Sequence, residues 1–359
     1  MKSTPAGLIY KMGANGKMKN NWKECQLGDL ITFQRGQDLP KTQMQGGKYP
    51  VVGSNGIIGY HNEYTTDAPS ITIGRSGNVG KPFLYRGKSW SHNTSLYIKE
   101  YKNIDPIFIF YFLQTLDLSN YAGGSAVPTL NRNHIHTLIV SVPVDIEEQR
   151  KIAAVLSALD DKIELNNKIN ENLEQQAQAI YQSMFVSTQH ETDRIGLLSE
   201  LITVKYGKDH KKLNDGFFPV YGSGGIMRYV EKSLYDKESV LIPRKGSLNN
   251  VLYVDEPFWS VDTMFFTEMK MPNIAKFVFH FVKSKDLDSL NAGSAVPSMT
   301  TDILNSMKVR IPSAERLAEF EGIVAPLYRT MKENVRQSEH LSALRDTLLP
   351  KLMNGEIEV

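Results

Sequence analysis

Two copies of one sequence pattern, about 169 residues apart, constrain this 359-residue chain more than any other feature. The pentapeptide Gly-Ser-Ala-Val-Pro begins at Gly124 and again at Gly293. The same separation aligns Arg75 with Arg244, Gly77 with Gly246 and Trp90 with Trp259. Two of the three tryptophans take part, so a chance match of one short motif cannot explain the pattern. We therefore expect a tandem repeat in which one supersecondary unit is built twice.

Each copy has two parts of different character. The first part is rich in glycine and β-branched residues in short alternating runs, which is typical of strands joined by tight turns. The second part begins at Asp145 in the first copy and contains no glycine or proline as far as Phe185, which predicts one long helix that Asp145 caps. The predicted organisation is a basic tail, a globular domain, a long helix, a second globular domain and a second long helix, at residues 1–21, 22–144, 145–188, 189–312 and 313–359.

Both helical parts carry an apolar heptad with spacings of four and three residues. In the first helix the repeat includes Leu156, Leu159, Ile163, Asn166 and Leu173, and in the second it includes Leu327, Met331, Asn334, Leu341 and Leu348. A period of 3.5 residues is the seam of a coiled coil, and polar residues within it fix the register at a cost in stability. The two helices are therefore expected to pair with each other in antiparallel orientation. The predicted fold class is α+β, with two homologous domains of mixed α/β structure joined by this helix pair in a pseudo-twofold arrangement.

Charge and composition narrow the class of protein. Residues 22–144 carry eleven basic and eight acidic side chains, and residues 194–312 carry sixteen and thirteen, whereas residues 145–193 carry four and ten. Basic domains joined by acidic helices fit an anionic ligand at the domains and protein partners at the helices. The single cysteine, Cys25, excludes a disulfide framework and predicts a cytoplasmic protein. The longest apolar run, Ile107–Leu113, is too short to cross a membrane.

The chain resembles the specificity subunits of type I restriction–modification systems over about residues 22–359. The resemblance rests on the segments PVVGSNGIIGY and GSAVPTLN, the helix VPVDIEEQRKIAAVLSALDDKIELNN and the ending RDTLLPKLMNGEI. It implies two target-recognition domains that each read one half of a bipartite, asymmetric DNA sequence. It also implies that the helix pair sets the gap between the halves and docks two modification subunits, which methylate adenine, and that restriction subunits join this core.

The same resemblance implies that this chain is not catalytic and binds no cofactor of its own. S-adenosylmethionine would belong to the modification subunit, and ATP and magnesium would belong to the restriction subunit. The residues agree, because the chain has no Asn-Pro-Pro-Phe or Asp-Pro-Pro-Tyr methyltransferase motif and no HxxxH metal spacing. The segment Gly74–Lys81 has one residue too many for a phosphate-binding loop, and Pro82 stands where a serine or threonine would bind magnesium.

Candidate DNA contacts are loop residues that suit base or phosphate recognition, and apart from the aligned Arg75 and Arg244 they differ between the copies. Arginine can bind guanine in a bidentate manner, asparagine can bind adenine, and lysine mainly binds phosphate. The candidates are Arg35, Arg75, Ser76, Asn78, His92 and Asn93 in the first domain and Lys208, Lys211, Arg244 and Lys245 in the second.

Several alternatives remain open from the sequence alone. The aligned Arg75 and Arg244 could form a structural salt bridge in both copies instead of binding DNA. The Gly-Ser-Ala-Val-Pro segments are expected to be turns that lead into a strand. His134 and His136, two residues apart, are expected on one face of a strand. Trp90 and Trp259 are expected to be core anchors. For the whole chain, the alternative function is a non-DNA scaffold in which a coiled coil carries two protein- or ligand-binding modules.

Overall fold

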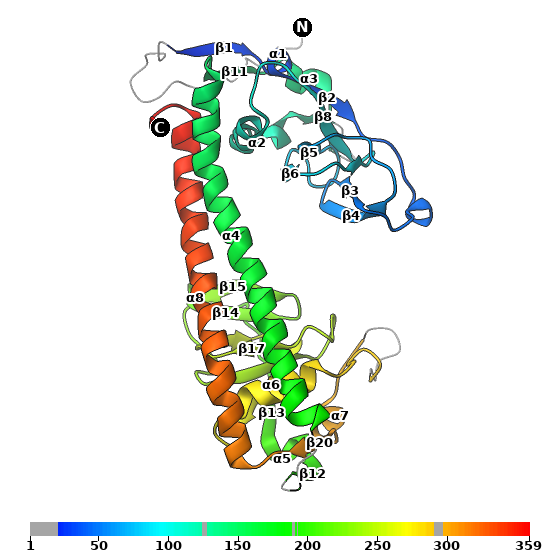
Figure 1. The fold of residues 1–359 in the computed structure, drawn as a ribbon, viewed down its shortest axis with the longest axis vertical. Coiled ribbons are helices and arrows are strands. Elements are labelled where there is room, and N and C mark those ends of the chain that lie inside the picture. Colours follow the sequence, from blue (N-terminus) through cyan, green and yellow to red (C-terminus); the bar gives the residue numbers. More distant parts are fainter. Residues whose placement is uncertain (1–20, 124–127, 189–190, 192, 291–296) are drawn as a thin grey trace. The chain divides into compact units, whose positions relative to one another are not determined.

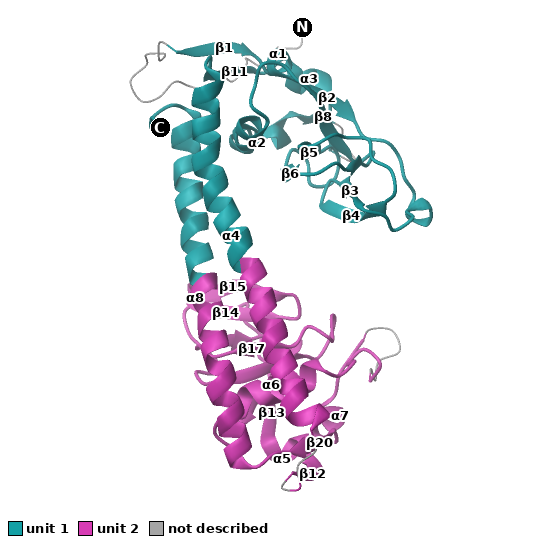
Figure 2. Ribbon diagram, in the orientation of Figure 1, with its two compact units in different colours: residues 1–166, 336–359 teal, residues 167–335 magenta. Residues whose placement is uncertain are grey.

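The computed structural model of the protein describes residues 21–123, 128–188, 191, 193–290 and 297–359. The chain divides into two compact units (Figure 2). Unit 1 comprises residues 1–166 and 336–359, and unit 2 comprises residues 167–335. Each unit therefore contains one globular domain together with part of each long helix. Among the described residues, no helix is long and apolar enough to cross a membrane.

The globular part of unit 1 alternates short strands and short helices (Figure 1). Its strands are β1 (Trp22–Gln26), β2 (Ile31–Arg35), β3 (Tyr49–Gly53), β4 (Gly56–His61), β5 (Ser70–Gly74), β6 (Pro82–Tyr85), β7 (Trp90–Ser91), β8 (Ser95–Tyr101), β9 (Ala122–Gly123), β10 (Thr129–Leu130) and β11 (Ile139–Pro143). Its helices are α1 (Leu27–Leu30), η1 (Lys41–Gln43), α2 (Pro106–Thr115), η2 (Leu118–Tyr121) and α3 (Arg132–His136). The main sheet has the strand order β2-β8-β5-β6, and a smaller sheet has the order β4-β3-β7.

Unit 2 repeats this topology. Its strands are β12 (Arg194–Leu197), β13 (Ile202–Tyr206), β14 (Asp215–Gly222), β15 (Gly225–Val230), β16 (Ser239–Pro243), β17 (Leu252–Val254), β18 (Trp259–Ser260), β19 (Met264–Met269) and β20 (Lys308–Ile311). Its short helices are α5 (Leu198–Leu201), α6 (Ala275–Lys283) and α7 (Thr301–Asn305). The orders β13-β19-β16-β17 and β15-β14-β18 match those of unit 1 strand for strand, and β12 pairs with β20 as β1 pairs with β11. The expected tandem repeat is therefore present.

The two long helices are α4 (Ile146–Tyr181), which continues into a π-helical turn at Gln182–Ser187, and α8 (Ala314–Met353). Asp145 caps α4, because its Oδ1 accepts a hydrogen bond of 2.9 Å from the amide of Glu147. In unit 1 the beginning of α4 packs on the end of α8, with Leu156 and Leu352 in one apolar cluster. In unit 2 the end of α4 packs on the beginning of α8, with Tyr181 and Phe320 in another. The pairing is therefore antiparallel within each unit.

Each domain has an apolar core that its own stretch of helix completes. The aromatic run in the first copy forms α2, which begins at Pro106 behind the N-cap Asp105 and buries Phe108, Ile109 and Phe112. In the second copy α6 buries Phe277, Phe279 and Phe281 in the same way. Because both helices lie in the cores that contain the long helices, each domain is anchored on its own segment of the helix pair.

Two details differ from the sequence expectation. His134 and His136 are two residues apart, which favours one face of a strand, but they lie on α3 because the Asn131 side chain caps a short helix there. Trp90 is only half-buried, whereas Trp259 is buried as expected for a core anchor. In both tryptophans the indole nitrogen donates to the backbone carbonyl of an aligned loop, at Gln37 and Lys208.

Candidate nucleic-acid interface

Three loops of the first domain meet beside the ends of β2, β5 and β7. The loop after β2 is joined to the end of β7 by the hydrogen bond from the Gln37 amide to the Ser91 carbonyl, at 2.8 Å. The loop after β5 is joined to the turn after β7 by the bond from the Arg75 amide to the Thr94 carbonyl, also at 2.8 Å. These backbone bonds hold most of the first domain's candidate DNA contacts on one group of loops.

The second domain uses the same backbone bonds at the aligned positions. The Lys208 amide donates to the Ser260 carbonyl and the Arg244 amide donates to the Thr263 carbonyl, each at 2.8 Å. Two copies with different side chains therefore present their loops on one shared backbone frame. A frame of this kind allows the exposed side chains to change without changing the loop geometry.

Aligned glycines make this close approach possible. A Cβ atom on Gly36 would lie 2.1 Å from the His92 carbonyl oxygen, and one on Gly207 would lie 2.0 Å from the Val261 carbonyl oxygen. Gly77 and Gly246 have φ values of 83° and 89°, a conformation that other residues rarely adopt. The glycines thus allow the close packing and the turn conformations on which the frame of the loops depends.

Arg75 and Arg244 make the same contact in their respective domains. Arg75 Nη1 donates to the Asn93 carbonyl at 3.4 Å, and Arg244 Nη1 donates to the aligned Asp262 carbonyl at 2.8 Å. Within the described part of the chain, neither guanidinium forms an ion pair. The salt-bridge alternative is therefore wrong for both residues. A single carbonyl contact orients each guanidinium and leaves its other N–H groups for a ligand.

The Arg35 side chain increases the positive potential near Arg75. Arg35 Nε donates to the same Asn93 carbonyl at 3.4 Å, so two guanidinium groups share one acceptor. Burial, and then the charge of Arg35, lower the pKa of Arg75 from its usual value. Two arginines held together, with no carboxylate partner in the ranges that the structure describes, favour the binding of an anion between or above them.

The other candidates in the first domain are engaged to different degrees. The Asn93 side-chain amide donates to Asp38 Oδ1 at 2.6 Å, and His92 Nε2 lies 3.7 Å from the same oxygen. The half-buried Ser76 pairs through its backbone with Thr129, and Asn78 is exposed on the same loop. Asp38 is a neighbour that sequence reasoning missed, and it occupies one of the donors that Asn93 would otherwise offer to a base.

The second domain presents lysines on the same frame. Lys208, Lys211 and Lys245 are exposed, and none of them forms an ion pair or a side-chain hydrogen bond with any described residue. The Arg244 guanidinium also lies 5.6 Å from the centre of the Tyr206 ring, which is exposed. Unpaired lysines are suited to phosphates, whereas the arginine pair of the first domain is suited to a base edge as well.

The Gly-Ser-Ala-Val-Pro segments lie largely outside the described residues, but the residues that follow them are described. Leu130 donates its amide to the Arg75 carbonyl at 2.8 Å, and Met299 donates to the aligned Arg244 carbonyl at 2.9 Å. Both segments therefore lead into a short stretch that is hydrogen-bonded to the arginine loop, and in the first domain this stretch is β10. Each pentapeptide thus directly precedes, in the sequence, residues that are hydrogen-bonded to the candidate interface.

The seam residues of the helix pair are less buried than a coiled-coil core would be. Leu156 and Asn166 are buried, whereas the other eight candidates, Leu159, Ile163, Leu173, Leu327, Met331, Asn334, Leu341 and Leu348, are half-buried. Two helices alone leave the flanks of a seam open to solvent, which accounts for the difference. Cross-helix hydrogen bonds occur at the polar positions, from Asn166 to Gln337 at 2.9 Å in unit 1 and from Asn334 to Asn170 at 2.8 Å in unit 2.

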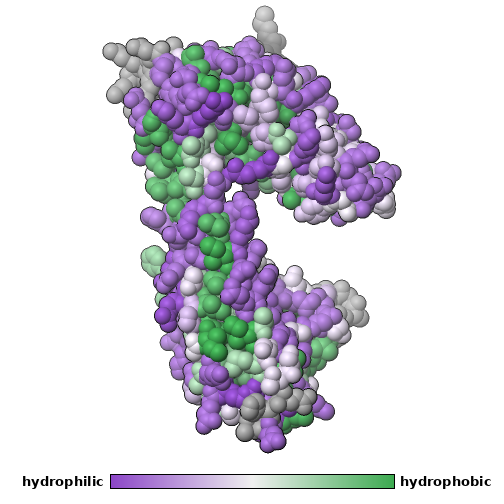
Figure 3. Space-filling model, viewed as in Figure 1, coloured by the Kyte–Doolittle hydropathy of each residue, from purple (hydrophilic) through white to green (hydrophobic). Residues whose placement is uncertain are grey.

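The exposed faces of the long helices carry apolar side chains. Leu165 and Val335 are each 49% exposed, and Ile323 and Leu344 are also exposed. Figure 3 shows that many of the hydrophobic residues visible on this face gather over the long helices, whereas the domain surfaces are mostly hydrophilic. Among the described residues, no group of histidine, cysteine and acidic side chains could hold a metal ion.

Comparison with known proteins places this architecture in a family. The sequence model of the type I restriction modification DNA specificity domain matches residues 19–175 and again residues 191–334. A protein assigned as a type I specificity subunit in Mycoplasma pneumoniae is 24% identical over 93% of this chain and 96% of its own length. The MjaIX specificity subunit of Methanocaldococcus jannaschii is 25% identical over 70% of this chain and 69% of its own.

A solved structure gives the same answer for the fold. The S subunit of a type I restriction–modification system from M. genitalium superimposes with a TM-score of 0.63 at 21% identity, over 94% of this chain and 98% of that chain. The double match of the family model corresponds to the two copies that the sequence repeat defines. Each match contains one domain and most of the long helix that follows it. The chain therefore belongs to the type I restriction–modification specificity subunits, the non-catalytic members of those complexes.

Proposed function

We propose that each domain reads one half of a bipartite DNA target through its three-loop frame. The observation that carries the proposal is the repeated arginine, because Arg75 and Arg244 are each oriented by a single carbonyl contact and by no carboxylate of the described residues. The side chains around them differ, with Arg35 and Asn78 in the first domain and lysines in the second, as expected for two unlike half-sites.

The long helices set the gap between the half-sites and bind two modification subunits, with restriction subunits joining that core. Support comes from the exposed apolar side chains of the helices and from the excess of acidic residues in 145–193. S-adenosylmethionine, ATP and magnesium are held by those partners, and this chain holds none of them. The scaffold alternative has no specific observation in its favour.

The test is sequencing of adenine methylation in the DNA of cells that express this chain with its modification subunit. A motif of two short sequences separated by a fixed unspecified gap is the expected result. Absence of methylation, or a contiguous palindromic motif, would contradict the proposal. Exchange of residues 22–144 for the matching domain of a relative with a different target should change one half of the motif and leave the other half unchanged.

Two arginine variants test the individual contacts. Loss of a bidentate arginine–guanine contact typically weakens binding by about 10- to 100-fold. Arg75→Ala should therefore relax one half of the motif and Arg244→Ala the other. Arg132→Ala, which removes an exposed arginine from α3 of the same unit, is the matched control and should leave the motif unchanged.

A further inference from the structure

Each domain contacts its own stretch of long helix through charged groups, and at one pair of aligned loops the charges have opposite signs in the two copies. In unit 1 the loop after β6 reads Arg86-Gly87-Lys88, and the aligned loop after β17 in unit 2 reads Asp255-Glu256-Pro257. The helix positions are reversed in the same sense. At matching positions α4 has Asp161 and Glu164 where α8 has Arg329 and Lys332.

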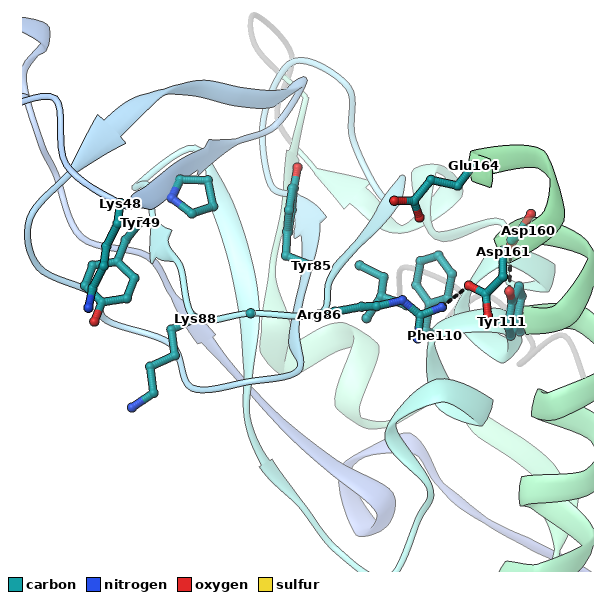
Figure 4. A pocket seen from close by; sticks show the side chains of 13 residues that line it. Lys48, Tyr49, Tyr85, Arg86, Lys88, Phe110, Tyr111, Asp160, Asp161 and Glu164 are labelled. Carbon is teal, nitrogen blue, oxygen red and sulfur yellow. Dashed lines mark hydrogen bonds and ion pairs between the residues drawn. The ribbon is translucent and has the colours of Figure 1, made fainter. Parts of the chain in front are cut away.

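At this loop of unit 1, a cation of the domain contacts an anion of the helix. Arg86 forms an ion pair with Asp161 (Figure 4). It also donates a hydrogen bond of 3.4 Å to the Ser157 hydroxyl. The same face of the domain places the buried Tyr111, whose hydroxyl donates to Asp160 Oδ2 at 2.6 Å. Arg86, Tyr111, Asp160, Asp161 and Glu164 all line one cavity of about 710 Å³ between the domain and α4.

At the aligned loop of unit 2, anions of the domain contact a cation of the helix. Elsewhere in unit 2 two lysines of α6 pair with glutamates of the long helices, so the reversal is confined to this loop. Lys332 Nζ on α8 lies 2.5 Å from Asp255 Oδ1 and 4.0 Å from Glu256 Oε2. The position aligned with Tyr111 is His280, which contacts Tyr328 of α8 at 3.0 Å, and Tyr328 aligns with Asp160. The two domains therefore contact the helices through the same loop and through helix positions one turn apart, with different hydrogen-bonding groups and, at this loop, opposite charges.

We propose that these contacts key each recognition domain to its own helix, so that the two domains cannot exchange positions without loss of correct docking. If the second domain were seated on α4, Asp255 and Glu256 would face Asp161 and Glu164. Like charges at a contact disfavour the wrong partner more effectively than one exposed ion pair favours the right one. Arg86, Asp161, Asp255 and Lys332 are positioning residues in this scheme, because they pair a domain with a helix and lie outside the three-loop frame.

A consequence is that the exchangeable module of this chain is a domain together with its helix contacts. The inference rests on the proposed function only for its methylation readout. Its first test needs neither DNA nor a partner, so failure of one idea is distinguishable from failure of the other. That test is hydrogen exchange measured by mass spectrometry on the full chain.

Three variants are compared in the exchange experiment: Arg86→Asp, Asp161→Arg and the double reversal. Each single reversal should speed exchange in α2 and in the facing turns of α4 by about fivefold, the scale of one surface charge pair turned repulsive. The double reversal should restore the wild-type rate. Lys88→Asp is the control on the same loop, because Lys88 pairs with Asp67 and not with α4. Equal exchange in all variants, or no recovery in the double reversal, would overturn the proposal.

The second test duplicates the second domain in the first position, by replacing residues 22–144 with residues 194–312. Two versions of this chimera are compared, one with the wild-type α4 and one with Asp161→Arg and Glu164→Lys in α4. When each is assembled with the modification subunit, the version with the wild-type α4 should methylate the expected symmetric motif at least tenfold less. Equal methylation by the two chimeras would refute a charge key. Loss of methylation by the wild-type chain itself would instead count against the proposed function.

Discussion

The buried histidine of unit 2 makes the stability of that unit depend on pH. His280 on α6 is fully buried, and its Nδ1 and Nε2 lie 2.7 Å from Gln178 Oε1 and 3.0 Å from the Tyr328 hydroxyl. A neutral imidazole satisfies both contacts, by donating from Nδ1 to Gln178 and accepting at Nε2 from Tyr328. Burial, and then the nearby charge of Lys283, lower the pKa of His280 to about 4 from the usual 6.5.

The sign and size of the effect follow from proton binding in the two states. Between pH 6.5 and 4 the unfolded chain binds a proton that the folded chain does not, so stability falls as the pH is lowered through this window. At pH 5 the difference between the two pKa values corresponds to a loss of about 2 kcal/mol relative to neutral pH, and the full loss below pH 4 approaches about 3 kcal/mol. The loss arises because protonation puts a charge in an apolar core and leaves Nε2 unable to accept from Tyr328.

The assay is urea unfolding at pH 7 and pH 5 with a tryptophan that reports on unit 2 alone. Of the three tryptophans, Trp259 is buried in unit 2, so Trp22→Phe and Trp90→Phe leave one reporter. In this background His280→Gln should remove most of the loss between the two pH values, because glutamine can donate to Gln178 and accept from Tyr328 but does not titrate. His340→Gln changes an exposed histidine of α8 and is the control. If His280→Gln retains the full pH dependence, the buried neutral imidazole is not its source.

Three further predictions concern the loops, the domain contact and the second helix. The double variant Lys208→Ala, Lys211→Ala should reduce the salt dependence of DNA binding by the assembled complex. The slope of log affinity against log salt concentration should fall by about two, because each lysine–phosphate contact releases about one counterion. A slope equal to that of the wild type would exclude phosphate contacts by these lysines. Tyr111→Phe should lower the free energy of unfolding of unit 1 by about 1 kcal/mol, because the hydrogen bond to Asp160 is lost. The measurement is urea unfolding, with Tyr60→Phe at an exposed tyrosine as the control, and equal stability of the two variants would contradict the prediction. Gly322→Ala on α8 should raise the free energy of unfolding of unit 2 by about 0.5–1 kcal/mol, because alanine favours the helix and its Cβ would meet no other atom within 4 Å. A decrease in this free energy, measured by urea unfolding, would refute the prediction.

The domain organisation of this protein can be predicted from its sequence because the sequence contains a tandem repeat and because its helices are long. A separation of 169 residues aligns strands, glycines and tryptophans, and the structure has the same strand order in both units. A heptad over some forty residues is a strong signal, and α4 and α8 follow it. Shorter elements are less certain, as shown by His134 and His136, where one capping side chain outweighs a two-residue period.

The site is only partly readable, because its geometry depends on contacts between segments far apart in sequence. The sequence identifies Arg75 and Arg244 as a pair but cannot distinguish a salt bridge from a carbonyl contact, since the acceptor is the backbone of a loop 18 residues away. Similarly, Asp38 and Asn93 are 55 residues apart, and nothing local joins them. The charge reversal between residues 86–88 and 255–257 is present in the sequence, but its meaning requires knowing which helix residues face those loops.

The shared loop frame has a consequence for how new specificities can arise. The bonds that hold the loops run between backbone groups, as from Arg75 to Thr94 and from Arg244 to Thr263, and so do not depend on which side chains the loops carry. Most of the side chains that differ between the copies, such as Asn78 and Lys245, are exposed and contribute nothing to the apolar cores. Substitutions at such positions usually change stability by less than about 0.5 kcal/mol. New loop side chains can therefore be acquired one substitution at a time while the protein remains folded at each step.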